Sequence, residues 1–142
     1  MKAILVHHAE AVGPEVDPQR PLSERGREQA DRLADALQAR GVVPAAIWHS
    51  GKLRSRQTAE AFLRRSPFAD FRMVRGLRPD DPPAWIHTEL VADIRDILLV
   101  GHMPNIFNLA RLLVPEGVAL PLHGLVGFER HPDAWAEFLR LG

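Results

Sequence analysis

Three apolar stretches of the sequence end in histidine. A histidine with an ordinary pKa of about 6.5 can act near neutral pH as a nucleophile, an acid or base, or a metal ligand. The three endings are His7-His8 after residues 3–6, His49-Ser50 after residues 45–48, and Gly101-His102 after residues 97–100. Open parallel sheets bind ligands beyond the carboxyl ends of their strands, so these side chains are candidates for one shared site.

The elements that must position these residues alternate along the chain. The apolar stretches predict strands at 3–7, 45–48 and 97–101, with a weaker strand at 71–75. Between them, helix-type spacing is predicted from Ser23 to Gly41, from Ser50 to about residue 63, over 85–93 and from Pro104 to 113. Residues 124–129 and 134–140 predict a terminal strand pair. The alternation predicts an α/β fold with a mostly parallel central sheet and helices on both faces.

The composition limits the classes of protein that fit. The chain has 142 residues, which predicts a single domain over 1–142. Basic and acidic residues number 18 each, and this balance argues against nucleic acid or an anionic membrane as a partner. The absence of cysteine excludes disulfides and zinc–thiolate sites. No signal peptide and no apolar stretch of the roughly 20 residues that span a bilayer is visible, so we expect a cytoplasmic protein.

Two kinds of chemistry fit histidines grouped at a sheet edge. The first is metal binding by His7, His8 and His102. Neighbouring strand residues point to opposite faces, so His7 and His8 share a site only if the chain turns between them. The second is phosphate chemistry, because a neutral histidine can attack phosphorus and Arg54 can grip phosphate oxygens. A helix that begins after Ser50 would also direct backbone N–H groups towards an anion.

Four stretches, taken in order, resemble the histidine phosphatase superfamily. "LVHHAEA" resembles its opening strand, and "RPLSERGREQADRLADAL" resembles the loop and helix that follow. "HSGKLRSRQTAE" is similar to a segment of the type S-P-x-x-R-x-x-Q-T-A, and "LLVGHMPNI" resembles the strand that carries a second histidine. Together these stretches span residues 3 to about 113. The chain looks most like the short, SixA-like branch of phosphohistidine phosphatases, which lacks a large capping insertion.

This resemblance implies a phosphohistidine intermediate without a metal or other cofactor. It carries the nucleophile over to His8, the phosphate-binding arginine to Arg54 and the second pocket histidine to His102. One departure is chemical: His7 stands where the family signature has an arginine that grips the phosphoryl group. We expect His7 to act as a titratable replacement with an ordinary pKa of about 6.5, so that His7→Arg would help most at high pH.

The remaining candidates have both a structural and a functional interpretation. Ser50 is a helix cap or a phosphate ligand, and Arg20 fixes its loop or touches substrate. Asp80 and Asp81 lie in a proline-rich loop where either could be the general acid, although such residues also form ordinary turns. The other histidines are interpreted as structural or surface residues, although a late loop carrying His123 could reach the site. The tryptophans, Trp85 among them, are interpreted as core residues.

The sequence therefore favours a metal-independent phosphatase whose substrate is a phosphohistidine protein or another phosphoprotein. Two alternatives remain open. Because His7 replaces the family arginine, the protein could be a pseudophosphatase that binds phosphate without turnover. It could also be a phosphomonoesterase that acts on a small phosphorylated metabolite.

Overall fold

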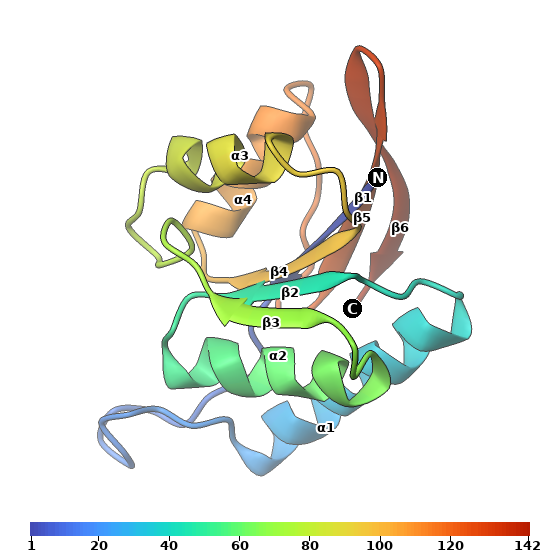
Figure 1. Ribbon diagram of the computed structural model, residues 1–142. Coiled ribbons are helices and arrows are strands. Elements are labelled where there is room, and N and C mark those ends of the chain that lie inside the picture. The colour runs from blue at the N-terminus through green and yellow to red at the C-terminus, as the bar shows by residue number, and fades with distance from the viewer.

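A six-stranded sheet forms the centre of the protein, and helices cover both of its faces (Figure 1). The computed structural model describes residues 1–142. The elements in chain order are β1 Lys2–His7, α1 Glu24–Ala39, β2 Ala46–His49, α2 Leu53–Arg65, β3 Asp70–Met73, α3 Pro83–Val91, β4 Ile97–Gly101, α4 Asn105–Leu113, β5 Leu125–His131 and β6 Ala134–Leu141.

The sheet is parallel except at its C-terminal edge. Its strand order is β3-β2-β4-β1-β5-β6, and the first four of these strands run parallel. β5 pairs antiparallel with β1, and β6 pairs antiparallel with β5. Parallel strands covered on both faces read as continuous apolar stretches, which is why β1 and β4 are the clearest strand signals in the sequence. The predicted α/β fold class and terminal strand pair are confirmed.

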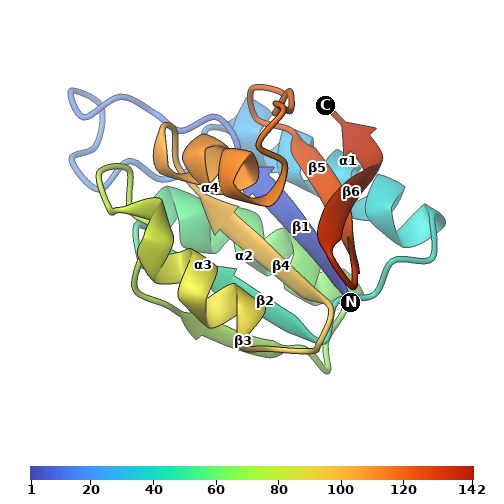
Figure 2. The ribbon, with the colours of Figure 1, turned by 90° about the horizontal axis from the view of Figure 1, so that it is seen from above.

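Each face of the sheet has its own hydrophobic core. Ile4 and Val6 of β1 face α1 and α2, whereas Ala3 and Leu5 face α3 and α4. Figure 2 shows α3 and α4 lying across the face that Figure 1 draws above the sheet. The alternate side chains of one strand thus fill two cores, which fixes the register of β1 between β4 and β5.

The helix boundaries follow local signals. Ser23 caps α1, because its hydroxyl oxygen accepts a hydrogen bond from the Gly26 N–H at 3.0 Å. Gly41 follows the end of α1 with a φ of 72°, a conformation that glycine adopts at little cost. α3 begins at Pro83, two residues earlier than the sequence predicts, because proline is well tolerated in a first helical turn. None of the helices is both long and apolar enough to cross a membrane.

Candidate active site

The histidine endings of three strands lie at one edge of the sheet. β4 pairs with β1 on one side and with β2 on the other, and His7 lies beside Gly101 in this register. His8, Ser50 and His102 each stand just beyond the end of one of these strands. The parallel topology therefore gathers residues that are about a hundred positions apart in the chain.

The chain turns immediately after His7. β1 ends there, and the His8 N–H donates to the Gly101 carbonyl at 3.1 Å. The ring centroids of His7 and His8 are 4.6 Å apart, and those of His8 and His102 are 4.9 Å apart. The chain therefore turns between His7 and His8, as a shared site requires, and their two rings lie beside each other.

A hydrogen bond to the backbone orients His8. Its Nδ1 lies 2.7 Å from the carbonyl oxygen of Ala9, which can only accept, so Nδ1 carries the ring proton. The other nitrogen, Nε2, then holds a free lone pair. The turn itself is fixed from α2, because the Ala9 N–H donates to Thr58 Oγ1 at 3.0 Å. A neutral imidazole held in this tautomer can act as a nucleophile.

Ser50 connects β2 to His102. Its Oγ accepts from the Lys52 N–H at 3.2 Å and lies 2.7 Å from His102 Nε2. Where the Ser50 hydroxyl donates this bond to Nε2, the proton of the neutral imidazole lies on Nδ1. That Nδ1 is buried and has no hydrogen-bond partner. The expectation that Ser50 caps the helix is wrong, because α2 begins at Leu53 with Lys52 at its N-cap position and without a side-chain cap; Ser50 instead contacts the Lys52 N–H and the His102 ring.

Arg54 supplies the positive charge of the site. It lies in the first turn of α2, and its Nε is buried without a hydrogen-bond partner. Burial and the charge of Arg20 lower the pKa of the Arg54 guanidinium, and no carboxylate pairs with it. Buried polar atoms without partners are rare in proteins, so Arg54 Nε and His102 Nδ1 mark a place where a ligand can bind.

Burial keeps the three site histidines neutral. Desolvation is the largest cause in each case, and it lowers the pKa of His8 to about 3 and that of His102 to about 2. The positive charge of Arg54 lowers both pKa values further, which also places its guanidinium near the two rings. A bound phosphate dianion would oppose these effects, because an opposite charge favours the protonated ring.

The ordinary pKa expected for His7 is wrong. Burial, followed by the charges of His123 and Arg54, lowers the pKa of His7 to about 4. The side chain is only 5% exposed, and a ring without contact to water loses the hydration that stabilises its charged form. His7 is therefore neutral at every pH at which the sequence expected it to titrate.

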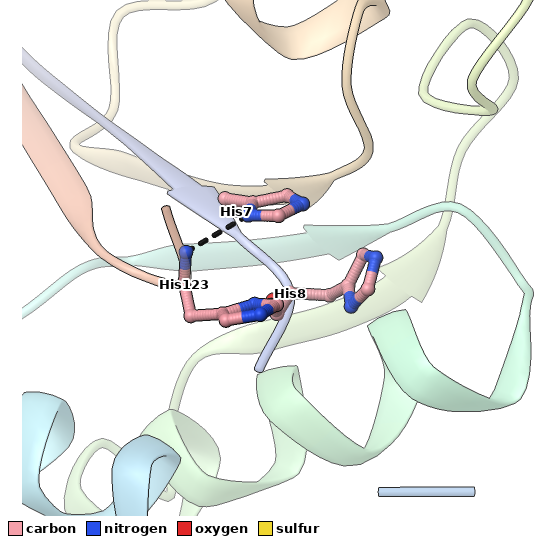
Figure 3. A group of neighbouring side chains, drawn as sticks. All are labelled: His7, His8 and His123. Carbon is pink, nitrogen blue, oxygen red and sulfur yellow. Dashed lines mark hydrogen bonds between the residues drawn. The ribbon is translucent and has the colours of Figure 1, made fainter. Parts of the chain in front are cut away.

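His123, which the sequence interpretation took as a structural or surface residue while noting that a late loop could reach the site, lies against His7. Its ring stacks on His7 with centroids 4.9 Å apart and an interplanar angle of 8°, as Figure 3 shows. Its Nδ1 lies 2.7 Å from the carbonyl oxygen of His8. His123 belongs to no strand and is far from the motifs in sequence, so only its place in a late loop hinted at this position. The other histidine near a strand end, His49, accepts a hydrogen bond from Gly51 and shapes the turn.

The three clustered histidines do not form a good metal chelate. Candidate ligand atoms of His7, His8 and His123 lie within 4.8 Å of one another. However, the lone pairs of histidine lie in the ring plane, and the nearly parallel planes of His7 and His123 direct them side by side. His7 Nδ1 is also occupied by the His123 N–H at 2.9 Å. The arrangement suits hydrogen bonding better than tetrahedral coordination.

The remaining candidates border the site at different depths. Arg20 Nε donates to the Val12 carbonyl at 3.0 Å, so this side chain fixes its loop, and its charge acts on Arg54. Asp81 Oδ2 accepts from the Arg78 N–H at 3.0 Å, and Asp81 lines a cavity of about 300 Å³ together with Ser50. Asp80 is exposed and is not part of that cavity.

An open groove continues from Ser50 over the surface between β3 and α3. The cavity beside Ser50 and a neighbouring one of about 490 Å³ share four lining residues, Met73, Val74, Arg75 and Trp85. Trp85 is 42% exposed and carries the Arg75 guanidinium over its ring, with Cζ 4.0 Å from the ring centroid. The interpretation of this tryptophan as a core residue is therefore wrong. Neither Arg75 nor Arg78 pairs with a carboxylate within 4.0 Å.

The fold matches several solved phosphatase structures over its whole length. The protein assigned as the phosphohistidine phosphatase SixA in Agrobacterium tumefaciens is 23% identical, with a TM-score of 0.83 and coverage of 99% of this chain and 97% of that one. A protein histidine phosphatase SixA complexed with tungstate is 18% identical, with a TM-score of 0.86 and coverage of 100% and 97%. A mycobacterial glucosyl-3-phosphoglycerate phosphatase complexed with VO3 is 19% identical, with a TM-score of 0.76 and coverage of 97% of each chain.

The family assignment comes from the sequence itself. No curated protein matches the chain. The family model described as histidine phosphatase superfamily (branch 1) matches residues 4–82, which is more than half of the chain and includes the endings of β1 and β2 and the start of α2. The segment that holds the nucleophile candidate and the arginine is thus the segment that the family shares, and the chain belongs to the histidine phosphatase superfamily.

Proposed function

We propose that the protein is a metal-independent phosphatase that transfers a phosphoryl group to His8 and then to water. The observation that carries this proposal is the free lone pair of His8 in a site that also holds two buried nitrogens without hydrogen-bond partners, one on Arg54 and one on His102. His8 Nε2 is available because Nδ1 is bound to the Ala9 carbonyl. Arg54 Nε and His102 Nδ1 are buried without partners; the His102 ring lies 4.9 Å from the His8 ring between centroids, and the charge of Arg54 acts on His8. Membership of a phosphatase superfamily supports the same reaction class.

In the first step, His8 Nε2 attacks phosphorus in line with the bond to the leaving group. A bond from nitrogen to phosphorus forms while the bond to the leaving oxygen or nitrogen breaks, and the leaving group takes up a proton. Asp80, Asp81 or a water molecule supplies that proton. Arg54 and His102, with His7, stabilise the charge on the equatorial oxygens, where most of the catalysis of phosphoryl transfer lies.

In the second step, water attacks the phosphorus of phospho-His8. The bond from phosphorus to Nε2 breaks, inorganic phosphate leaves, and the neutral imidazole is regenerated. The low pKa of free His8, about 3, supports this step, because the released nitrogen does not hold a proton at neutral pH. The Nδ1 bond to Ala9 keeps the ring in one orientation through both steps.

Phosphate carried on a protein side chain is the substrate class that we propose. The groove that leaves Ser50 gives room for the polypeptide on one side of the phosphorylated residue. Its exposed Met73 and Trp85 provide apolar contact, and Arg75 and Arg78 provide charges that no carboxylate neutralises. Two structurally similar proteins are named as a phosphohistidine phosphatase and as a protein histidine phosphatase, which supports phosphohistidine as the phosphorylated group.

A small phosphorylated metabolite is the second candidate. The same unpaired arginines could bind a carboxylate or a second phosphate of such a molecule. Other structurally similar proteins are named as a phosphoserine phosphatase from Entamoeba histolytica and as a glucosyl-3-phosphoglycerate phosphatase. A panel of small phosphate monoesters set against a phosphohistidine protein separates the two substrate classes by their kcat/KM values.

Mass spectrometry of protein quenched during turnover tests the reaction itself. We expect an acid-labile phosphoryl group on His8, and no labelling of the His8→Ala variant. Asp80→Asn and Asp81→Asn should each keep detectable labelling, since losing an acid slows departure of the leaving group without removing the nucleophile. His131→Ala, an exposed histidine on β5, serves as the matched control.

Two results would contradict the proposal. Full labelling of His8→Ala would place the intermediate on another residue. Phosphate binding without any labelling or turnover of the wild-type protein would instead support the binding module that the His7 replacement suggests.

A further inference from the structure

His7 and His123 form a linked pair at the base of the candidate site (Figure 3). His7 is the residue that stands in place of the family arginine, and it is almost fully buried. Its Nδ1 accepts a hydrogen bond from the backbone N–H of His123 at 2.9 Å. The two rings stack nearly parallel, with centroids 4.9 Å apart.

The bond from His123 selects one tautomer of His7. A backbone N–H can only donate, so Nδ1 of His7 must present its lone pair. In a neutral imidazole the proton then lies on Nε2, at the other side of the ring. Figure 3 shows this second nitrogen pointing away from His123, on the side where the His8 ring lies.

Two further contacts fix the loop that carries His123, one from His123 itself and one from the next residue. Its Nδ1 lies 2.7 Å from the His8 carbonyl oxygen, to which it donates. The next residue, Gly124, accepts the His7 N–H at 2.9 Å through its carbonyl oxygen. His123 has a φ of 52°, in the left-handed region that is uncommon for residues other than glycine, although histidine is among those that enter it more readily. A residue held in such a conformation costs free energy, and these contacts with the His7–His8 segment stabilise it.

The groups around His7 also keep it uncharged. It is surrounded by His8 from the turn after β1, His102 from the end of β4, His123 from the loop before β5, and Arg54 from α2. None of these groups is a carboxylate, so nothing in the free site stabilises a positive charge on the ring. A neutral ring also stacks on His123 without the repulsion that two protonated rings would have.

We propose that His123 is a positioning residue that holds His7 as a neutral donor, with its Nε2–H directed to the phosphoryl group in the place of the family arginine. This inference rests on the proposed function for the identity of the ligand. It replaces a permanent charge by a fixed hydrogen bond, whose donor is present at every pH above the titration of His7. The loss of charge leaves Arg54 as the main cation that faces the phosphoryl group.

Heteronuclear NMR of protein with isotope-labelled histidine tests the tautomer directly. Between about pH 6 and about pH 9, we expect one neutral form of His7 with the proton on Nε2 and no titration. Addition of inorganic phosphate should shift the His7 Nε2–H signal. A His7 ring that carries its proton on Nδ1, or that titrates near its ordinary pKa of about 6.5, would overturn the proposal.

Two variants of His123 separate positioning from simple packing. Asparagine adopts the left-handed conformation and has a side-chain amide that can donate to the His8 carbonyl. Glycine loses both the ring bond to the His8 carbonyl and the stack on His7, which together hold the backbone N–H of residue 123 against His7 Nδ1. We expect His123→Gly to show mixed His7 tautomers and about tenfold weaker binding of inorganic phosphate, and His123→Asn to restore much of both. The matched control, His131→Gly, should change neither. A single Nε2–H tautomer in His123→Gly, or equal phosphate binding by His123→Gly and the wild type, would refute the role.

A second pair of variants addresses His7 itself. His7→Gln places a neutral amide donor near the position of Nε2, and His7→Leu removes the donor. Calorimetry with inorganic phosphate should show binding by His7→Gln within about threefold of the wild type and clearly weaker binding by His7→Leu. Equal phosphate binding by the leucine variant and the wild type would show that His7 donates nothing. Because NMR and phosphate binding do not need turnover, failure of the positioning role stays distinguishable from an absence of phosphatase activity.

Discussion

The two ends of α2 use arginine in opposite ways. At its first turn, Arg54 faces three histidines and has a buried donor without a partner. At its last turn, Arg64 and Arg65 reach carboxylates of α1 at distances of 2.9–3.2 Å. One helix thus carries a charge that is left free for a ligand and charges that are satisfied within the protein.

The difference comes from what the neighbouring element provides. α1 presents Asp31 and Asp35 to the last turn of α2, and Arg65 donates to both of them. The strand ends that surround the first turn provide histidines, a serine and backbone groups, and no carboxylate. An exposed ion pair contributes little to stability, whereas an unpaired, partly buried cation marks a place where an anion can bind strongly.

Exchange of one arginine at each end of α2 should give the largest contrast. We expect Arg54→Gln to lower kcat/KM for a phosphorylated substrate by at least about a hundredfold, because it removes a charged donor from the transition state. Arg65→Gln should leave kcat/KM nearly unchanged, since this side chain lies at the far end of the helix. Steady-state kinetics of both variants at one ionic strength is the measurement. Similar losses of kcat/KM in the two variants would mean that both act through folding, and that Arg54 has no particular role in the site.

Acid should lower the free energy of unfolding in two different pH ranges, one set by the histidines near the first turn of α2 and one by Asp31 near its last turn. The pKa values of His7, His8 and His102 are lowered in the folded state, so the unfolded chain binds more protons as the pH falls below about 6.5. Each histidine then lowers the free energy of unfolding by about 1.4 kcal/mol per pH unit until its folded pKa is reached. The pKa of Asp31 is also lowered, because the hydrogen bonds from Arg65 and Arg64 outweigh its desolvation, so its contribution is lost only as the pH falls below about 4.

Urea denaturation at a series of pH values between 7 and about 3 measures both effects. We expect saturating inorganic phosphate to reduce the decline between about pH 6.5 and about pH 4, because the anion stabilises protonated histidines. Asp31→Asn should reduce the later decline, to which Asp70 and Asp93 also contribute, and leave the earlier decline unchanged. A free energy of unfolding that stays constant down to about pH 4.5 would contradict the low histidine pKa values.

The ion pairs of Arg65 with Asp31 and Asp35, at the last turn of α2, should contribute only a small and salt-dependent part of the free energy of unfolding. Arg65→Gln breaks contacts with two exposed carboxylates, so we expect a loss of about 0.5–1 kcal/mol at low ionic strength and less at about 1 M salt. Denaturant titrations at the two salt concentrations test this expectation. A loss of several kcal/mol that salt does not change would indicate that Arg65 contributes through packing instead.

The smallest expected effect concerns the pH dependence of His7. If His7 is neutral throughout, the ratio of rates between His7→Arg and the wild type should stay flat from about pH 5.5 to about pH 8. A pH series of hydrolysis rates in identical salt decides this point. A ratio that rises steeply towards pH 8 would show that His7 titrates in the working range, as the sequence alone suggested.

The sequence determined most of the architecture and which strand endings meet at the candidate site. The apolar strands and the spacing of the helices predict the α/β fold, because a parallel sheet buried on both faces leaves a strong local signal. The motifs around His8, Arg54 and His102 are local too, and strand endings in a parallel sheet must meet. The structure also shows what Gln57 and Thr58 of the family-like segment do: their side-chain oxygens accept hydrogen bonds from the backbone N–H groups of Leu22 and Ala9.

Only the tertiary structure decided which polar groups are left unpaired. Sequence cannot distinguish Arg54 from Arg65, because the carboxylates that satisfy the second come from another helix. The turn after β1 brings His7 beside His8, and a loop more than a hundred residues later brings His123 to both. Burial and hydrogen-bond partners set the charge and tautomer of each ring, and both depend on contacts between segments that are distant in the chain.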